Sequence, residues 1–149
     1  MVVRVGVSAE KKPDFLSRLV AFFLMRPYSH IFIIHDGFIY HSVTKGISSV
    51  EYNEYRASNH IIASKKVVLD CKPDIFINHF NFYKDLKYAE SQVFGFIPFI
   101  GRLFNNGRKG AWCSEYVGWV LSDLGRRWEF AEGDISTPKM FEKIKGVAE

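Results

Sequence analysis

The chain has 149 residues and a formal net charge of +4, with 48% apolar and 24% charged residues. This length fits one ordinary domain, residues 1–149, and leaves no room for a second. The apolar content excludes a disordered chain, and the lack of a heptad or G-X-Y repeat excludes a coiled coil or a collagen helix. The small positive charge is too common to identify an anionic partner.

Two cysteines, Cys71 and Cys113, are too few for a disulfide framework. No C-x-x-C or H-x3-H spacing is present, so the sequence predicts no structural zinc site and implies no cofactor. The N-terminal residues lack the apolar segment of a signal peptide, and the apolar stretches at 19–25 and 93–101 are too short to span a bilayer. We therefore expect a protein of a reducing compartment, the cytoplasm.

The first half of the chain alternates between apolar and polar residues in the way typical of β-strands. Strands are predicted over residues 2–8, 30–35, 38–43, 47–52 and 61–69. A helix is predicted over 15–25, where apolar residues recur at helical spacing and Arg26-Pro27 ends the pattern. The dipeptide Asp36-Gly37 is the strongest short signal for a hairpin between two of these strands.

The second half of the chain predicts helices over residues 73–86, 112–124 and 137–145. The first helix is expected to place four side chains on one face: Ile75, Phe76, His79 and Tyr83. The second has an apolar stripe at Tyr116, Val117, Val120 and Leu121. Gly125 is expected just beyond its end. An irregular loop is predicted over 93–111, and the whole pattern indicates an α+β fold.

The predicted hairpin brings two histidines together. With a two-residue turn at Asp36-Gly37, His30 and His41 become diagonal neighbours on one face of the two strands. His35 points to the opposite face and is the poorer candidate. A single strand histidine is usually structural, whereas two on one face of an apolar hairpin favour a chemical role.

Cys113 stands at the start of a predicted helix, after a glycine-rich loop. The unpaired amides and the positive end of the helix dipole stabilise a thiolate there, and they can also hold an oxyanion. Cys71 has no comparable feature, so we interpret it as a small buried hydrophobe. A nucleophile, a base and a group that orients the base form a catalytic triad. We assign Cys113 as nucleophile, His30 as base and His41 as the orienting group.

Several segments resemble the circularly permuted branch of the papain-like NlpC/P60 superfamily, in which the histidine precedes the cysteine. They are Tyr28-Ser-His-Ile-Phe-Ile-Ile, Phe38-Ile-Tyr-His-Ser, Trp112-Cys-Ser-Glu-Tyr-Val and Ser136-Thr-Pro. The resemblance spans nearly the whole chain and implies an antiparallel sheet or small barrel packed against helices. It also implies a cysteine hydrolase of the amidase or peptidase type, acting through an acyl-thioester. The segment at Lys87-Tyr88 is similar to one that carries a tyrosine near the family's site, which makes Tyr88 a candidate substrate-binding residue.

The sequence leaves other functions open. Some members of the permuted branch carry Glu where this chain has His41, so the orienting group here departs from theirs. The order His-His-Cys also resembles the lecithin:retinol acyltransferase relatives, although these typically show N-C-E-H-F around the nucleophile. A lipid acyltransferase or phospholipase is therefore the second hypothesis, and a catalytically idle binding module is the third.

The expected partner is a substrate with an amide or ester bond: a peptide, a peptidoglycan fragment or a lipid. Aromatic and aliphatic residues crowd 94–104, and basic residues border them. A packed loop is the simpler interpretation, and the alternative is a wall for an acyl chain or a peripheral contact with a membrane. No nucleic-acid-binding motif accompanies the basic residues, so we expect no nucleic acid partner.

Overall fold

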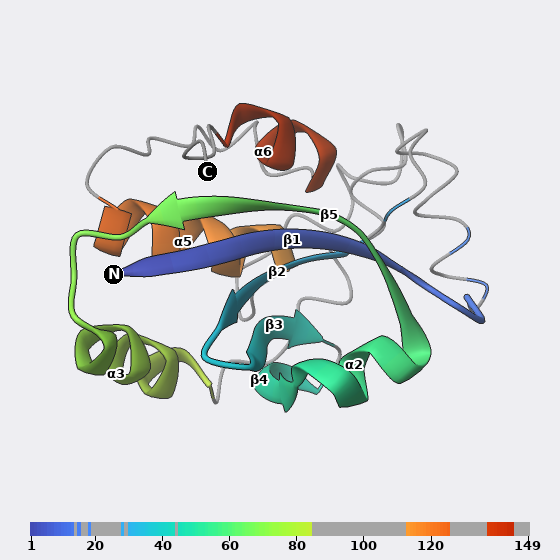
Figure 1. Ribbon diagram of the computed structural model, residues 1–149, viewed down its shortest axis with the longest axis horizontal. Coiled ribbons are helices and arrows are strands. Elements are labelled where there is room, and N and C mark those ends of the chain that lie inside the picture. The colour runs from blue at the N-terminus through green and yellow to red at the C-terminus, as the bar shows by residue number, and fades with distance from the viewer. Residues whose placement is uncertain are drawn as a thin grey trace, which may run out of the picture.

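The computed structural model describes residues 1–13, 15, 18, 28, 30–43, 45–84, 113–125 and 137–144 (Figure 1). Its strands are β1 (Val2–Glu10), β2 (His30–His35), β3 (Phe38–Val43), β4 (Gly46–Glu51) and β5 (Asn59–Val68). Its helices are α2 (Tyr52–Ser58), α3 (Pro73–Tyr83), α5 (Cys113–Gly125) and α6 (Thr137–Lys143). The strands form one antiparallel sheet and the helices pack against it, which confirms the α+β class.

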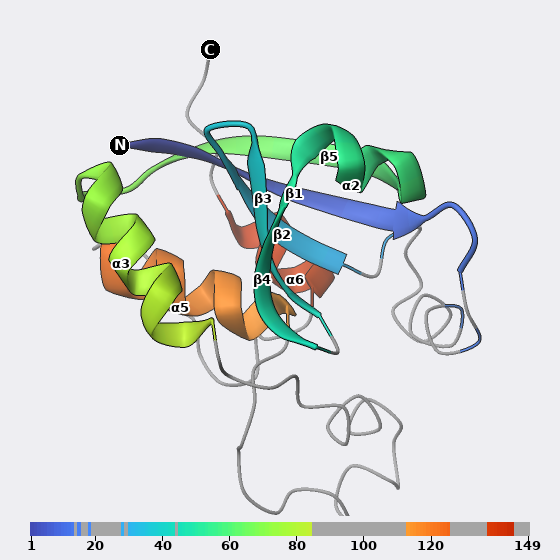
Figure 2. The same ribbon diagram turned by 90° about the horizontal axis from the view of Figure 1, so that it is seen from below.

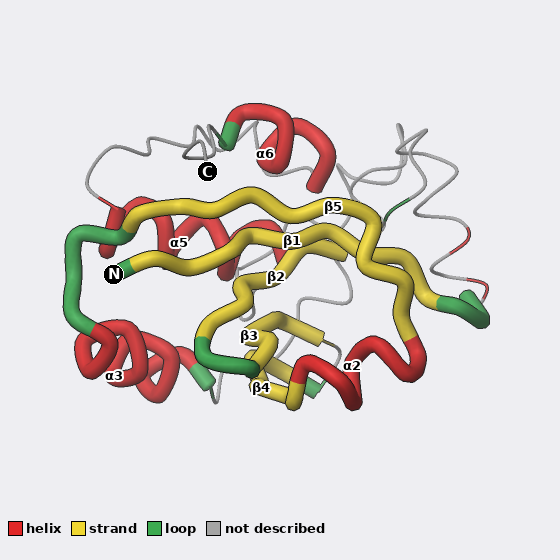
Figure 3. Tube along the Cα trace, in the orientation of Figure 1, coloured by secondary structure: helices red, strands yellow, loops and turns green. Residues whose placement is uncertain are grey.

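The sheet has the strand order β4-β3-β2-β1-β5, so β1 lies inside it although it comes first in the chain. Figure 3 shows β1 and β5 running side by side along most of their length. Their register shifts between Val7 and Ser8, where the two strands bulge. Ser8 is therefore paired with His30 of β2 on one side and with Ile61 of β5 on the other. These three residues form one row across the sheet.

The hairpin between β2 and β3 has the predicted register. Asp36 and Gly37 both have positive φ angles, 48° and 76°, as a type I′ turn requires. His35 pairs with Phe38 and Ile34 with Ile39, so the loop contains two residues. This pairing fixes which side chains of the two strands share a face, because successive residues alternate.

The two faces of the sheet have separate apolar clusters. On the inner face, Val3, Val5 and Val7 of β1 and Ile31 and Ile33 of β2 pack with side chains of α3, α5 and α6. On the outer face, a smaller cluster contains Phe32, Ile39 and Tyr55 of α2. Figure 2 shows α3 and α5 on one side of the sheet and α2 on the other. The inner face holds most of the buried apolar residues.

The predicted apolar stripe of α5 is confirmed, since its four side chains are all fully buried: Tyr116, Val117, Val120 and Leu121. The helix differs at its end, because Gly125 is its last residue and not the residue after it. Lys65 of β5 fixes the end of α6, where its Nζ donates hydrogen bonds to the carbonyls of Phe141 and Ile144 at 2.7 and 3.0 Å. These bonds satisfy carbonyls that a helix end leaves unpaired.

The largest difference from the sequence prediction is α2. Tyr52 was expected to end a strand, and instead it begins a seven-residue helix that leads into β5 at Asn59. In α3, Ile75 is 46% exposed and lies outside the buried face, which is centred on Phe76. That helix ends at Tyr83, earlier than predicted.

Some predictions lie outside the described residues: most of the helix over 15–25, the loop over 93–111, Trp112 and Lys145. None of the helices in the described ranges has both the length and the apolar character needed to cross a membrane.

Candidate active site

The two predicted histidines lie together on the outer face of the hairpin. His30 is the first residue of β2, and His41 is the fourth residue of β3. Nε2 of His30 lies 3.1 Å from Nδ1 of His41, which is a hydrogen bond between two imidazoles. The ring planes are nearly perpendicular, at 74°, and the ring centroids are 5.2 Å apart. The predicted register and the predicted pairing of these side chains are therefore both confirmed.

Both imidazoles are neutral at neutral pH. Burial lowers the pKa of His30 to about 3, and a positive charge on His41 would lower it further. Burial also lowers the pKa of His41 to about 4. Removal of water disfavours the charged form of each ring, and two adjacent imidazolium ions would repel each other. In the neutral pair, one ring donates its N–H and the other accepts with its lone pair.

A buried tyrosine covers the histidine pair. The ring of Tyr55 lies 6.5 Å from that of His30 and 5.5 Å from that of His41, measured between centroids. Its Oη forms a 2.6 Å hydrogen bond with Oγ of Ser8, in which either hydroxyl can donate. Ser8 is fully buried. The outer face therefore holds two hydrogen-bonded pairs of polar side chains, His30 with His41 and Ser8 with Tyr55.

Cys113 lies in the other layer of the fold. It is the first residue of α5, which packs on β2 and β3, and its side chain is 5% exposed within the inner cluster. A negative charge on Cys113 raises the pKa of Tyr55, so the thiol lies within electrostatic range of the residue that covers both imidazoles. The structure thus joins His30 and His41 directly, whereas Cys113 is linked to this group through its electrostatic effect on Tyr55.

The residues that the sequence set aside lie away from this group. His35 lies on the inner face, where its ring contacts Phe76 at 5.5 Å between centroids. Cys71 follows β5, and burial raises the pKa of its thiol, although the nearby N-terminal amine opposes this effect. The candidate substrate-binding residue Tyr88 lies outside the described residues.

A histidine with a carboxylate partner occurs elsewhere in the molecule. Nε2 of His79 lies 3.0 Å from Asp123 in the last turns of α5. Asp123 is ten residues beyond Cys113, which corresponds to roughly 15 Å along a helix. This pair therefore joins α3 to the far end of α5 and cannot orient a base beside Cys113.

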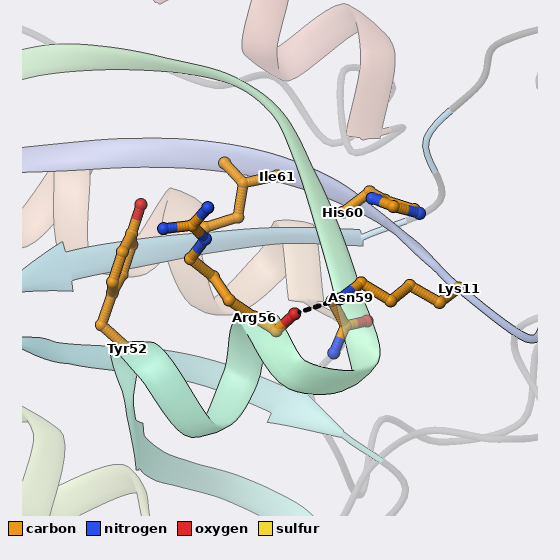
Figure 4. A pocket seen from close by; sticks show the side chains of 6 residues that line it. All are labelled: Lys11, Tyr52, Arg56, Asn59, His60 and Ile61. Atoms are coloured by element: carbon orange, nitrogen blue, oxygen red, sulfur yellow. Dashed lines mark hydrogen bonds between the residues drawn. The ribbon is translucent and has the colours of Figure 1, made fainter.

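A polar cavity of about 300 Å³ lies at the junction of α2 and β5 (Figure 4). Six residues line it: Lys11, Tyr52, Arg56, Asn59, His60 and Ile61. Figure 4 shows the Arg56 side chain near Tyr52, with Lys11 and His60 pointing another way. Within the described ranges, no three His, Cys, Asp or Glu side chains gather to hold a metal ion.

Sequence reasoning missed Ser8 and Tyr55. Ser8 was placed in a strand, but nothing local indicated that its side chain would be buried beside His30. Tyr55 lies in a helix that was not predicted, 47 residues away from its hydrogen-bond partner. The only available signal was the position of Ser8 one residue after Val7, which places it on the outer face by alternation.

Comparison of the chain with protein-family models, with curated proteins and with solved structures finds no match.

Proposed function

We propose that the protein is a cysteine-dependent hydrolase with Cys113 as nucleophile, His30 as base and His41 as the residue that orients the base. The observation that carries this proposal is the 3.1 Å hydrogen bond between the two imidazoles beside the outer apolar cluster. A buried pair of this kind fixes the tautomer and the orientation of one ring by means of the other. The position of Cys113 at the start of α5 supplies the nucleophile.

The hydrogen bond determines which nitrogen can act as base. Nε2 of His30 is occupied by His41, so Nδ1 is the remaining nitrogen that can accept a proton. In the productive tautomer, Nε2–H of His30 donates to Nδ1 of His41, and the lone pair on Nδ1 of His30 is available. His41 is then protonated on Nε2 and remains neutral, because burial lowers its pKa to about 4.

The proposed reaction begins with transfer of the thiol proton of Cys113 to Nδ1 of His30. The thiolate then attacks the carbonyl carbon of the substrate, and amides in the first turn of α5 stabilise the oxyanion. Collapse of this intermediate breaks the bond to the amine or alcohol, which leaves with the proton from His30. Water, deprotonated by His30, then attacks the thioester, releases the acid and restores the thiol.

The circularly permuted papain-like fold and an amide- or ester-bearing substrate are part of the same proposal. The chain order supports them, because the histidine hairpin precedes the cysteine helix and an antiparallel sheet packs on that helix. The proposed enzyme needs no cofactor, since its nucleophile and base are both side chains of this chain.

The first test uses a thiol-directed activity probe and a generic ester with single variants. Cys113→Ala and His30→Ala are expected to lower turnover by roughly 1000-fold or more, because each removes an essential reactant. His41→Ala is expected to cost roughly 10- to 100-fold, and His41→Asn or His41→Gln to retain part of that rate through the side-chain acceptor.

Two variants serve as matched controls, Cys71→Ala and His35→Ala, and both are expected to stay near the wild-type rate. Preferential labelling of Cys71, or a loss with His35→Ala equal to that with His30→Ala in a folded protein, would contradict the assignment. Transfer of the acyl group to an added alcohol or amine in place of water would identify an acyltransferase. A Cys113 thiol that no probe modifies in the folded protein would indicate a binding module.

A further inference from the structure

We propose that Tyr55, anchored by Ser8, is a positioning residue that keeps the His30–His41 pair in the arrangement in which His30 can accept the proton of Cys113. This inference rests on the proposed function and assigns a role to two residues outside the triad. It follows from the contacts of the Tyr55 ring, from the way the residue is fixed at both ends, and from the weakness of a single bond between imidazoles.

The Tyr55 ring lies beside three other rings of the outer face. It lies 5.1 Å from the ring of Phe32, in addition to its contacts with His30 and His41. His30 in turn stacks on Phe32 at 6.1 Å. The four rings therefore form one packed group, in which Tyr55 touches both members of the histidine pair from the α2 side. In this arrangement the Tyr55 ring packs beside both imidazoles.

Tyr55 is held at its hydroxyl and at its main chain. The hydroxyl is bonded to Ser8 at 2.6 Å, and the carbonyl accepts a 3.1 Å hydrogen bond from Nδ2 of Asn59. Lys11 extends from the end of β1 and donates to the carbonyls of Arg56 and Ala57 at 2.7 and 3.1 Å. A seven-residue helix has little stability of its own, so these bonds determine where Tyr55 lies.

The histidine pair gains from such support because a single hydrogen bond, worth about 1 kcal/mol, restrains the turning of each ring about its bond to Cβ only weakly. A half-turn of His41 would replace Nδ1 by a carbon atom and break the bond to His30. A carboxylate would offer two equivalent oxygens and an opposite charge, whereas a neutral imidazole offers one lone pair. Packing against the imidazoles therefore strengthens the orientation that the hydrogen bond sets.

Tyr55 itself does not exchange protons in this scheme. Burial raises its pKa well above the ordinary value, and the charges of Cys113 and Glu10 raise it further, while the bond to Ser8 opposes the shift. The phenol therefore remains protonated at every pH at which a thiol enzyme works. Its bond to Ser8 persists over that range, which is what an anchor requires.

The experiment compares variants in a Cys71→Ala background, so that Cys113 is the thiol that reports. Tyr55→Phe removes only the hydroxyl, Ser8→Ala removes the anchor from the other side, and Tyr55→Leu removes the ring. Tyr52→Phe is the matched control, because Tyr52 lies one turn earlier in α2 and packs partly buried against the outer cluster. The two readouts are the pH profile of iodoacetamide alkylation of Cys113 and the ¹⁵N chemical shifts of the imidazoles, which report their tautomers.

Tyr55→Phe and Ser8→Ala are each expected to slow alkylation at pH 7 by roughly threefold to tenfold, the effect of one lost hydrogen bond. The double variant is expected to be no slower than either single variant, because both remove the same bond. Tyr55→Leu is expected to be slower still. The imidazole shifts of His30 should change from one tautomer to a mixture in all of these variants, and should stay unchanged in Tyr52→Phe.

The outcome separates this inference from the proposed function. If His30→Ala leaves the alkylation profile of Cys113 unchanged, the hydrolase proposal is wrong and this inference with it. If His30→Ala alters the profile while Tyr55→Phe and Ser8→Ala match Tyr52→Phe, only the role of Tyr55 is wrong. A lower melting temperature in those variants without a change in tautomer or profile would likewise make Tyr55 purely structural.

Discussion

Each face of the sheet holds a buried cluster, but the two clusters are built from different side chains. The inner face is mainly apolar, although Ser42 of β3 is also buried there, and its cluster with α3, α5 and α6 contains large fully buried residues such as Phe76 and Leu121. The outer face has a short apolar cluster beside buried or partly buried polar groups: Ser8, His30, His41 and the hydroxyl of Tyr55.

This contrast separates the side chains whose burial stabilises the fold from those whose burial needs another explanation. Burial of apolar surface stabilises the inner face without requiring partners. Each polar group on the outer face loses its water, and only a hydrogen bond offsets that loss. Aliphatic side chains would fill the same space at no such cost. This difference supports the proposal of a functional role for the hydrogen-bonded groups on the outer face, while the inner face mainly supplies stability.

The strongest test of this contrast is a truncation on the inner face. Phe76 is fully buried, and its ring lies 5.0 Å from that of Tyr40. Phe76→Ala is expected to lower the free energy of unfolding by about 3–5 kcal/mol, through lost transfer energy and the cavity that remains. Urea denaturation measures this change.

Phe82→Ala is the control on the same helix, because Phe82 is 77% exposed, and it should change stability by less than about 0.5 kcal/mol. Equal effects of the two variants would contradict the assignment of the core to this face.

A smaller effect is expected from acid on the outer face. The pKa values of His30 and His41 fall to about 3 and about 4 in the folded protein, below the ordinary value of 6.5. The unfolded chain therefore binds more protons below pH 6.5, so stability is fully present above that pH and decreases as the pH falls toward 4. Each imidazole is expected to contribute on the order of 1 to 2 kcal/mol of this loss between pH 7 and pH 5.

The control for the acid effect replaces both partners at once. His30→Leu/His41→Leu removes the buried pair without leaving an unpaired nitrogen, so its stability at pH 7 is expected to stay near that of the wild type. Its loss of stability between pH 7 and pH 5 should be smaller by the contribution of the two imidazoles. Parallel pH dependences of the double variant and the wild type would show that the histidines are not the groups that titrate.

The hairpin and α5 could be predicted because their signals are local. Asp36-Gly37 selects a two-residue turn, the turn sets the register, and alternation then decides which face His30 and His41 share. The stripe of α5 repeats over several turns, so its buried face is unambiguous. These features depend on residues within about a dozen positions of each other.

The supporting residues could not be predicted, because their partners are distant in the sequence. Helix α2 has seven residues and a single buried side chain, Tyr55, so it shows no apolar period. Its position depends on Ser8, which lies in β1, and on Lys11, which follows that strand. The prediction that Ile75 lies on the buried face was wrong for a related reason. A helical pattern gives the apolar arc, but the packing against Tyr40 decides that Phe76 is its centre.

The smallest expected effect compares two buried tyrosines, one on each face. Tyr55 has its hydroxyl bonded to Ser8, whereas the hydroxyl of Tyr116 is buried with no hydrogen-bond partner among the described residues. Replacement of each by Phe removes one oxygen and keeps the ring.

Tyr55→Phe loses a bond and leaves Ser8 unpaired, so it is expected to lower the free energy of unfolding by about 1 kcal/mol. Tyr116→Phe removes a desolvated hydroxyl that forms no hydrogen bond with the described residues, so it is expected to raise stability by up to about 1 kcal/mol. Urea midpoints at pH 7 with unchanged m-values measure both changes. Opposite signs would sharpen the distinction between a paired polar outer face and an apolar inner face, whereas a loss of stability with Tyr116→Phe would show that the inner face, too, depends on a polar contact.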